Sequence, residues 1–382
     1  MPRFIHMADL HLGAPFSFLG ENKQKIRRKD LESAFTRAVD FALDPDNRID
    51  GVWIAGDLFD MIDPPDDTVY RVKSEIERLN RGNIDVLLAP GTHDPSIYPE
   101  SVYKKHKFKG LTILNDYNIG EPLHWRYGDR DFFFYGFEYH PIHSNPPFGK
   151  FQKTDSPGVH VAIIHGSLML SNQWDIADAH VPLYPEDLGK TGMDYIALGH
   201  YHNFMEKNIG GSLVVYPGTL EGRKFSESGE RFLVVVEFDH NNIRIEKIPW
   251  NRRIFQQVEI NIDMEPVENE TDIIKLIQEF SARGEDLLLR VKLTGVSEFI
   301  INSDFIRRIV SNKFFHFEIE DDTDILDSMA LESIASEKTV RGLFIRNILG
   351  KLMDADEREE KVLKKALKLA MVKLQGGENL EI

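Results

Sequence analysis

The first 250 residues alternate short apolar runs with longer amphipathic stretches. Short apolar runs bounded by turn residues are typical of buried strands, whereas apolar residues spaced by three and four are typical of helices. The predicted strands are Phe4–Ala8, Gly51–Ala55, Val86–Ala89, Leu111–Leu114, Phe132–Phe137, Val159–Ile164, Tyr195–Leu198, Leu213–Tyr216 and Phe232–Phe238. Residues 24–43 and 66–80 have the helical spacing, as in Val69, Val72 and Ile76. Because early strands alternate with helices and later strands follow in quick succession, we expect an α/β sandwich with a mixed sheet.

The pattern changes near residue 250. A strand–helix–strand–helix–strand order follows, and only helices are predicted from Asp324 on. The elements of the first of these parts are Phe255–Ile262, Asp272–Ser281, Leu287–Leu293, Ser303–Ser311 and Phe314–Ile319. We therefore expect three parts, with a small α+β domain at 251–322 between residues 1–250 and a helical region at 323–382. The helical region has two apolar stripes, Val340, Leu343, Phe344, Ile348 and Leu352, and Leu363, Leu367, Ala370 and Leu374.

Composition and charge are those of a globular protein. Apolar residues make up 42% and charged residues 28% of the chain, and the absence of cysteine excludes disulfides and thiolate metal sites. The net charge of −16 argues against broad nucleic-acid binding through a basic surface, although bound divalent cations would reverse the charge locally. The start, MPRFIHMADLHLG, shows no secretory leader, and no apolar run has the length of a membrane span. We expect a cytoplasmic protein without membrane contact.

Five predicted strands are followed by side chains that can bind metal ions. In chain order these candidates are Asp9, His11, Asp57, Thr92, His93, Asp94, His165, His200 and His202. Ligand sites in α/β sheets gather beyond the carboxyl ends of the strands, so these groups are expected to converge. Carboxylates combined with imidazoles suit Mn, Zn or Fe. In the alternative interpretation, the histidines bond backbone carbonyls and the aspartates cap helices.

The motifs MADLHLG, GDLFD, GTHD, IIHG, GHYH and YPGT resemble those of the calcineurin-like metallophosphoesterases. Within that family the chain is similar to the SbcD-type DNA-repair nucleases and to their YhaO-like bacterial branch. The resemblance implies a four-layer α/β/β/α sandwich with a small α+β cap domain and C-terminal helices. It also implies two divalent metal ions, manganese above all, that serve phosphodiester hydrolysis. By this likeness Asp9, His11, Asp57 and His202 hold one ion, and Asp57, position 92, His165 and His200 hold the other.

The resemblance gives His93 the role of a histidine that stabilises the transition state or protonates the leaving oxygen. Asp60, the last residue of GDLFD, would be its partner, because a carboxylate orients an imidazole and raises its pKa. Asp60 also fits a helix-start residue that accepts backbone N–H groups. Asp94 fits a turn residue before Pro95 better than a supporting role near the metal.

Thr92 departs from the family pattern, which has asparagine at this position with the amide oxygen as ligand. A threonine hydroxyl is shorter and a poorer donor to a divalent cation. Three outcomes are open: Thr92 ligates weakly, water fills its position, or the remaining ligands hold the second ion loosely. We therefore expect an asymmetric pair in which the second ion is the weaker one.

Two basic segments, KQKIRRK at 23–29 and YKKHKFK at 103–109, interrupt the acidic background. Cations mixed with aromatic side chains suit a DNA strand, although a solvated helix face is equally typical of such runs. The candidate phosphate contacts are Arg27, Arg28, Lys104 and Lys105, with Arg223, Lys224, Arg252 and Arg253 as further candidates.

The resemblance also implies partners. The apolar stripes of the C-terminal helices, which otherwise fit a local core, would dock on an SMC-like (SbcC-type) ATPase. The chain has no phosphate-binding loop of its own, so that partner would supply ATP-driven gating. A homodimer that acts near the nucleoid is implied as well.

Three functions fit these residues: a Mn-dependent DNA exo- or endonuclease in break repair, a hydrolase of nucleotides or phosphoproteins, and a non-catalytic DNA-end clamp. GDLFDMI lacks the Asp-Arg-Gly that continues this motif in protein phosphatases. The retained set of candidate ligands argues against a decayed site. We therefore expect the nuclease.

Overall fold

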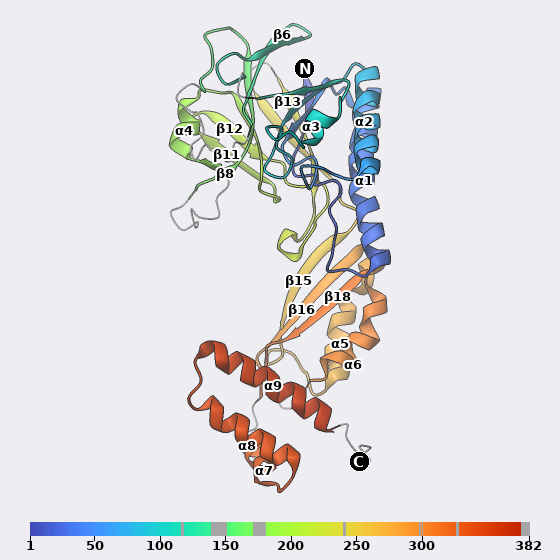
Figure 1. Cartoon of the computed structure of the whole chain (residues 1–382), viewed down its shortest axis with the longest axis vertical. Coiled ribbons are helices and arrows are strands. Elements are labelled where there is room, and N and C mark those ends of the chain that lie inside the picture. The colour runs from blue at the N-terminus through green and yellow to red at the C-terminus, as the bar shows by residue number, and fades with distance from the viewer. Residues whose placement is uncertain are drawn as a thin grey trace. The chain divides into compact units, whose positions relative to one another are not determined.

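The computed structural model describes residues 1–115, 118–138, 151–170, 181–239, 242–297, 299, 301–325 and 328–375. The chain forms two compact units, Met1–Ile254 and Phe255–Ile382 (Figure 1). The boundary between these units lies four residues beyond the predicted end of the first domain at residue 250. The further division at 322 stays a prediction.

One six-stranded sheet of the first unit carries the predicted N-terminal strands. Its order is β14 (Ile243–Pro249), β13 (Phe232–Phe238), β1 (Arg3–Met7), β2 (Gly51–Ala55), β3 (Asp85–Ala89) and β4 (Leu111–Ile113). The strands from β1 to β4 run parallel, so their carboxyl ends lie at the same edge. In contrast, β13 runs antiparallel to both of its neighbours.

A second six-stranded sheet repeats this plan. Its order is β11 (Met205–Ile209), β12 (Ser212–Tyr216), β10 (Tyr195–Gly199), β7 (Val159–His165), β6 (Arg130–Gly136) and β5 (Leu123–Tyr127). The four central strands are parallel, and the edge strands β5 and β11 are antiparallel to their neighbours. Here too the parallel strands bring their carboxyl ends together.

The two sheets pack face to face around an aromatic core. Phe4 stacks on Trp53 in the first sheet, and Trp53 contacts Phe134 and Tyr195 of the second. Helices α1 (Glu21–Leu43) and α2 (Asp66–Arg81) lie side by side, and α2 contacts β3 (Figure 1). Leu188 of α4 (Pro185–Lys190) belongs to a separate cluster on the outer face of the second sheet. Helices thus cover both sheets, which confirms the predicted α/β sandwich.

Short elements connect these layers. They are α3 (Val102–Lys105), β8 (Ser167–Leu168), β9 (Pro182–Leu183) and the 3-10 turns η1 (Pro45–Asn47) and η4 (Phe225–Glu227). Turn η4 lies in the segment between β12 and β13. This segment carries four residues that line the candidate site, Arg223, Lys224, Ser226 and Glu227.

The second unit begins with a three-stranded sheet in the order β15 (Ile254–Asn261), β16 (Leu287–Thr294) and β18 (His316–Asp321). Its other elements are α5 (Glu270–Gln278), η5 (Glu279–Asp286), β17 (Val296–Ser297), α6 (Ser303–Val310), η6 (Ser311–Lys313), β19 (Asp324–Ile325), α7 (Ser328–Ser336), α8 (Val340–Leu352) and α9 (Glu357–Gln375). Among the described residues, no helix combines the length and apolar character needed to cross a bilayer.

The C-terminal helices form their own small core. Ile345 and Ile348 of α8 pack with Leu367 of α9, whereas Val340 and Leu343 stay 79% and 54% exposed. The side chain of Leu374, predicted for one stripe, lies outside the described residues. Both predicted stripes therefore contribute to a local core, and part of the first one remains on the surface.

Candidate metal centre

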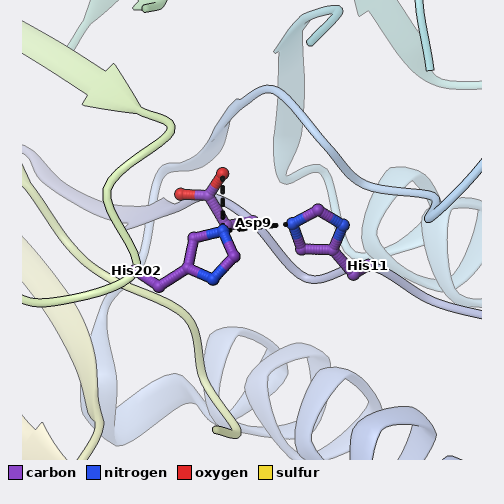
Figure 2. Close-up of side chains that lie close together, drawn as sticks. All are labelled: Asp9, His11 and His202. Atoms are coloured by element: carbon purple, nitrogen blue, oxygen red, sulfur yellow. Dashed lines mark hydrogen bonds and ion pairs between the residues drawn. The ribbon is translucent and has the colours of Figure 1, made fainter. Parts of the chain in front are cut away.

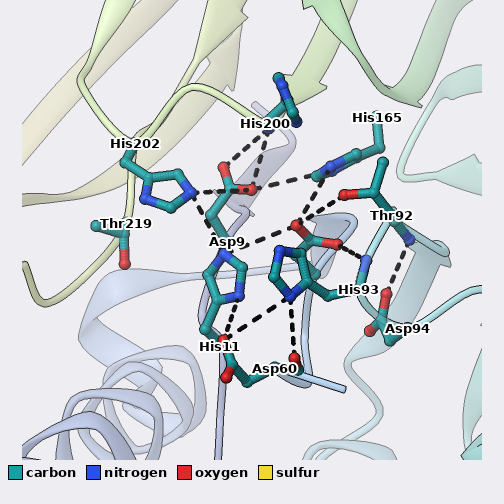
Figure 3. A network of polar contacts seen from close by, with 12 residues as sticks. Asp9, His11, Asp60, Thr92, His93, Asp94, His165, His200, His202 and Thr219 are labelled. Atoms are coloured by element: carbon teal, nitrogen blue, oxygen red, sulfur yellow. Dashed lines mark hydrogen bonds and ion pairs between the residues drawn. The ribbon is translucent and has the colours of Figure 1, made fainter. Parts of the chain in front are cut away.

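The predicted ligands converge at the carboxyl ends of β1, β2, β3, β7 and β10 (Figure 3). Four of them adopt left-handed backbone conformations, with φ of 53° at Asp9, 45° at His11, 50° at Asp57 and 113° at His200. Such conformations cost non-glycine residues about 1–3 kcal/mol each and persist where the surrounding structure holds them in place. The strain is concentrated at the residues that turn side chains into the centre.

The first cluster consists of Asp9, His11 and His202 (Figure 2). Nε2 of His11 and Nε2 of His202 face each other at 3.3 Å, and His202 Nε2 lies 3.9 Å from Asp9 Oδ1. Burial, reinforced by the positive charge of Arg223, lowers the pKa of His11 well below its usual value. The neutral imidazole therefore has a lone pair to offer. Facing nitrogen atoms beside a carboxylate are a donor set that suits a divalent cation.

The second cluster is built on Asp57 and His165. His165 Nδ1 contacts the backbone oxygen of Ala55 at 3.0 Å, and its Nε2 points to Asp57 Oδ2 at 3.4 Å. This Nε2 atom is buried and has no hydrogen-bond partner among the described residues. Asp57 Oδ2 also lies 3.7 Å from His11 Nε2, so one carboxylate oxygen is shared between the two clusters.

Two other predicted ligands lie at the periphery of the second cluster. Thr92 Oγ1 is 3.5 Å from Asp57 Oδ2, which is the long limit of a hydrogen bond. The His200 ring lies edge-on to that of His165, with ring centroids 5.3 Å apart, and its backbone N–H donates to both oxygens of Asp9. His200 thus fixes the carboxylate of Asp9 through its main chain.

The backbone of Gly91 lies so close to Asp57 that only a residue without a side chain fits there. A Cβ atom at Gly91 would overlap both Oδ1 and the backbone nitrogen of Asp57. Asp57 is 2% exposed, and His165 and His93 hold its pKa below the usual value even though burial acts in the opposite direction. An ionised, buried carboxylate surrounded by imidazoles fits divalent cations, which would neutralise it.

The predicted pairing of His93 with the Asp60 carboxylate is a long contact in the structure, and its catalytic role stays a prediction. His93 Nδ1 contacts the backbone oxygen of Asp60 at 2.9 Å, and the carboxylate Oδ1 is 3.9 Å away. That oxygen lies closer to Arg223 Nη1, at 2.7 Å, and to His11 Nδ1, at 3.0 Å. The main chain of Asp60 orients His93, while its side chain supports His11 and Arg223.

Asp94 supports the loop rather than a metal ion. It is fully buried, and its oxygens accept hydrogen bonds from the backbone N–H groups of Gly91 and Phe59 and from the hydroxyl of Tyr103. Burial, together with the charge of Asp57, raises the pKa of Asp94 to about 6. The expected turn role therefore includes fixing the GTHD loop beside β2.

Sequence reasoning missed Glu227. Its Oε1 lies 2.7 Å from His202 Nδ1, and its Oε2 accepts the backbone N–H of Arg223 at 2.6 Å. A carboxylate behind a metal-binding histidine fixes the tautomer and makes the other ring nitrogen a better ligand. Glu227 lies in the irregular segment after YPGT, where no spacing rule connects it with GHYH.

A cavity of about 860 Å³ opens at this centre, a volume within the range of small-ligand sites. It is lined by Asp57, Ile62, Thr92, His93, Pro95, Tyr98, His200, Tyr201, His202, Asn203, Arg223, Lys224, Ser226 and Glu227. His93 is the exposed histidine of the centre, with 45% of its side chain accessible. The cavity thus reaches both clusters and the candidate proton donor.

The prediction that Arg27 contacts a phosphate is wrong. Its side chain is fully buried, and Nη1 donates to Asp30 at 2.7 Å and to Glu221 at 3.0 Å, so it does not reach a surface ligand. Arg28 is half-buried, and neither it nor the exposed Lys104 and Lys105 belongs to the residues that line the cavity.

The aromatic residues of YKKHKFK are likewise not available to stack on bases. Phe108 is 8% exposed, and Tyr103 packs against Phe59 while its hydroxyl donates to Asp94. Lys105 pairs with Asp63 at 2.6 Å, and Lys104 donates to the backbone oxygen of Ile97. The segment packs onto the fold instead of presenting a stacking surface.

Comparison with known proteins identifies the family of this chain. The family described as calcineurin-like phosphoesterase matches residues 2–204, and the chain therefore belongs to that family. The uncharacterized metallophosphoesterase YhaO of Bacillus subtilis is 28% identical over 314 residues, covering 77% of this chain and 72% of YhaO. This confirms the family resemblance drawn from the motifs.

Archaeal relatives carry the name DNA double-strand break repair protein Mre11. The protein from Methanopyrus kandleri is 27% identical over 281 residues, covering 66% of this chain and 58% of its own length. The protein from Aeropyrum pernix is 30% identical over 277 residues, with 69% and 64% covered. The matches thus span less than two thirds of each of these two archaeal relatives.

Proposed function

We propose that the chain is a two-metal phosphodiesterase that cleaves DNA in the repair of breaks, with manganese as the metal. The observation that carries this proposal is the position of Asp57 Oδ2, which lies 3.7 Å from His11 Nε2 and 3.4 Å from His165 Nε2. One carboxylate oxygen between two groups of imidazole nitrogens suits a pair of ions better than a single ion. Phosphoesterase activity itself is the property of the family to which the chain belongs.

The residues divide into two ligand sets. Asp9, His11, Asp57 and His202 would hold one ion, and Asp57, Thr92, His165 and His200 the other. When bound, the two ions supply the positive charge that activates water and neutralises the phosphoryl group as the attacked bond breaks. In its imidazolium form, His93 would donate the Nε2 proton to the leaving oxygen, since its Nδ1–H is engaged with the backbone oxygen of Asp60.

DNA is proposed as the substrate because several relatives are named as DNA double-strand break repair proteins. The resemblance to SbcD-type nucleases extends the proposal to an SMC-like ATPase partner on the C-terminal helices, where Val340 and Leu343 are exposed. A homodimer and an association with the nucleoid belong to the same proposal. A phosphodiesterase for nucleotides, or a DNA-end clamp without catalysis, is the competing function.

One assay separates these functions. The purified chain is incubated with Mn²⁺ and linear DNA, a panel of nucleotides, or bis(4-nitrophenyl) phosphate, beside the variants His93→Ala and His124→Ala. His124 is a matched control, since it is 55% exposed on β5 and pairs with Asp131 away from the cavity.

We expect DNA cleavage by the wild type and His124→Ala and its loss in His93→Ala. Cleavage of nucleotides without cleavage of DNA would reject the proposed nuclease and favour a phosphodiesterase for small substrates. DNA retention on a gel without any hydrolysis would replace it with the clamp.

A further inference from the structure

We propose that Arg223 and Lys224 bind a phosphate of the substrate strand next to the phosphate that is cleaved. This inference rests on the proposed phosphodiesterase function and adds a requirement to it. The enzyme would act on a strand with more than one phosphate, in preference to a diester with a single phosphate. Both residues line the cavity that contains His93 and His202.

Arg223 has hydrogen-bonding capacity left for a ligand. A guanidinium has five N–H donors, and the side chain of Arg223 uses Nη1 to donate to Asp60 Oδ1 at 2.7 Å. Its Nε is buried and has no acceptor in the described part of the chain. Nε and Nη2 form one edge of the guanidinium, which matches two phosphate oxygens in a bidentate hydrogen bond. A substrate phosphate would satisfy this edge.

The distance of Arg223 from the clusters decides which phosphate it meets. Asp60 Oδ1 lies between Arg223 Nη1, at 2.7 Å, and His11 Nδ1, at 3.0 Å. The opposite nitrogen of His11, Nε2, faces Asp57 and His202. A carboxylate and an imidazole ring therefore separate the guanidinium from the ligand cluster. We therefore assign Arg223 to a neighbouring phosphate rather than to the one that is cleaved.

The segment that carries Arg223 is held from both sides. The backbone N–H of Arg223 donates to Glu227 Oε2 at 2.6 Å. The backbone oxygen of the preceding Gly222 accepts from Arg27 Nη2 at 2.7 Å. The buried Arg27 also binds Glu221, whose other oxygen accepts the backbone N–H of Arg252. A cation fixed in this way loses little conformational entropy when it binds a phosphate. Arg27, predicted as a DNA contact, instead positions the loop of another arginine.

Lys224 extends the same positive site toward solvent. Its side chain is exposed, and no carboxylate of the described residues forms a salt bridge with it. Within a chain of net charge −16, Arg223 and Lys224 are two adjacent cations in a lining that also holds Asp57 and Glu227. Such a pair attracts a phosphodiester strand and gives binding that weakens with salt.

The test compares substrates that contain one or several phosphates. Full-length wild type and the variants Arg223→Ala, Lys224→Ala and Arg244→Ala are assayed with Mn²⁺ on a single-stranded oligonucleotide and on bis(4-nitrophenyl) phosphate. Arg244 is the matched control, as it is 65% exposed on β14 and contacts Glu237 and Asp239 outside the cavity. Calorimetric titration with Mn²⁺ checks that each variant keeps its ions, and Lys224→Ala tests the proposal on an exposed side chain that folding does not need.

We expect KM for the oligonucleotide to rise about tenfold or more in Arg223→Ala, as for a lost charge-assisted hydrogen bond, and less in Lys224→Ala. The rate on the small diester should change less than about threefold in Lys224→Ala, whose exposed side chain pairs with neither Asp60 nor His11. Equal losses on both substrates in Lys224→Ala, or no change on the oligonucleotide in either cavity variant, would overturn the inference. If the wild type cleaves neither substrate, the proposed function fails by itself. Anisotropy of a labelled oligonucleotide then decides the phosphate site: weaker binding in both cavity variants supports it and unchanged binding rejects it.

Discussion

Replacing Glu227 with glutamine removes one negative charge behind His202 and leaves the size of the side chain nearly unchanged. The native carboxylate is 3% exposed, and its Oε1 lies 2.7 Å from His202 Nδ1. Although burial acts in the opposite direction, the hydrogen bond with His202 lowers the pKa of Glu227, so the native group is ionised at neutral pH. An ionised partner makes Nε2, the nitrogen that faces Asp9 and His11, a stronger ligand.

Loss of such a carboxylate partner typically weakens metal binding by about 10–100-fold, which corresponds to about 1.4–2.8 kcal/mol. We expect a loss of this size for one of the two Mn²⁺ binding events in Glu227→Gln and little change for the other. Calorimetric titration of the full chain measures both. Glu21→Gln is the control, because Glu21 is 81% exposed and pairs with Lys25 on the surface of α1. The reasoning is refuted if Glu227→Gln binds both ions as the control does.

Three further substitutions test separate parts of the structure. Thr92→Asn should strengthen the weaker Mn²⁺ site, because an amide oxygen reaches further than the hydroxyl that lies 3.5 Å from Asp57; two equally tight sites in the wild type would contradict this. Gly91→Ala should abolish binding of both ions, since its Cβ would displace the shared Asp57, and titration should show no such loss in Gly120→Ala, where nothing lies within 4 Å. Arg27→Ala should lower the free energy of unfolding by about 3–5 kcal/mol in urea, because Glu221 is left buried without its cation; Arg28→Ala should change it by less than about 0.5 kcal/mol, and similar values for both would disprove the structural role of Arg27.

Most of the strands that the sequence predicts are largely buried, although the predicted edge strand β4 is half-buried throughout. The strands β2, β7 and β10 are buried along nearly their whole length, and their apolar runs are visible without any alignment. Three edge strands, β5, β11 and β14, were missed. They mix half-buried with exposed residues, in strict alternation in Leu123–Tyr127, and a strand of this kind has no apolar run to reveal it. These three strands form by antiparallel hydrogen bonding to a neighbouring strand, and the sequence does not show that pairing.

The same distinction applies to the site. Side chains directly after buried strands could be placed together because parallel strands share one edge. Glu227 has no such marker, and the position of the Asp60 carboxylate depends on Arg223, which is 163 residues away in sequence. Arg27 was predictable in principle, since it precedes the buried Leu31 by one helical turn and thus continues the inward face of α1. The sequence prediction instead treated KQKIRRK as one exposed basic segment, because five of its seven residues are cations.

Anomalous diffraction from a crystal soaked in Mn²⁺ tests the shared centre most directly. We predict two peaks with Asp57 between them, one beside Asp9, His11 and His202 and the other beside His165, with the weaker peak on the side of Thr92. A single peak that does not touch Asp57, or no peak among these side chains, would contradict the two-metal assignment.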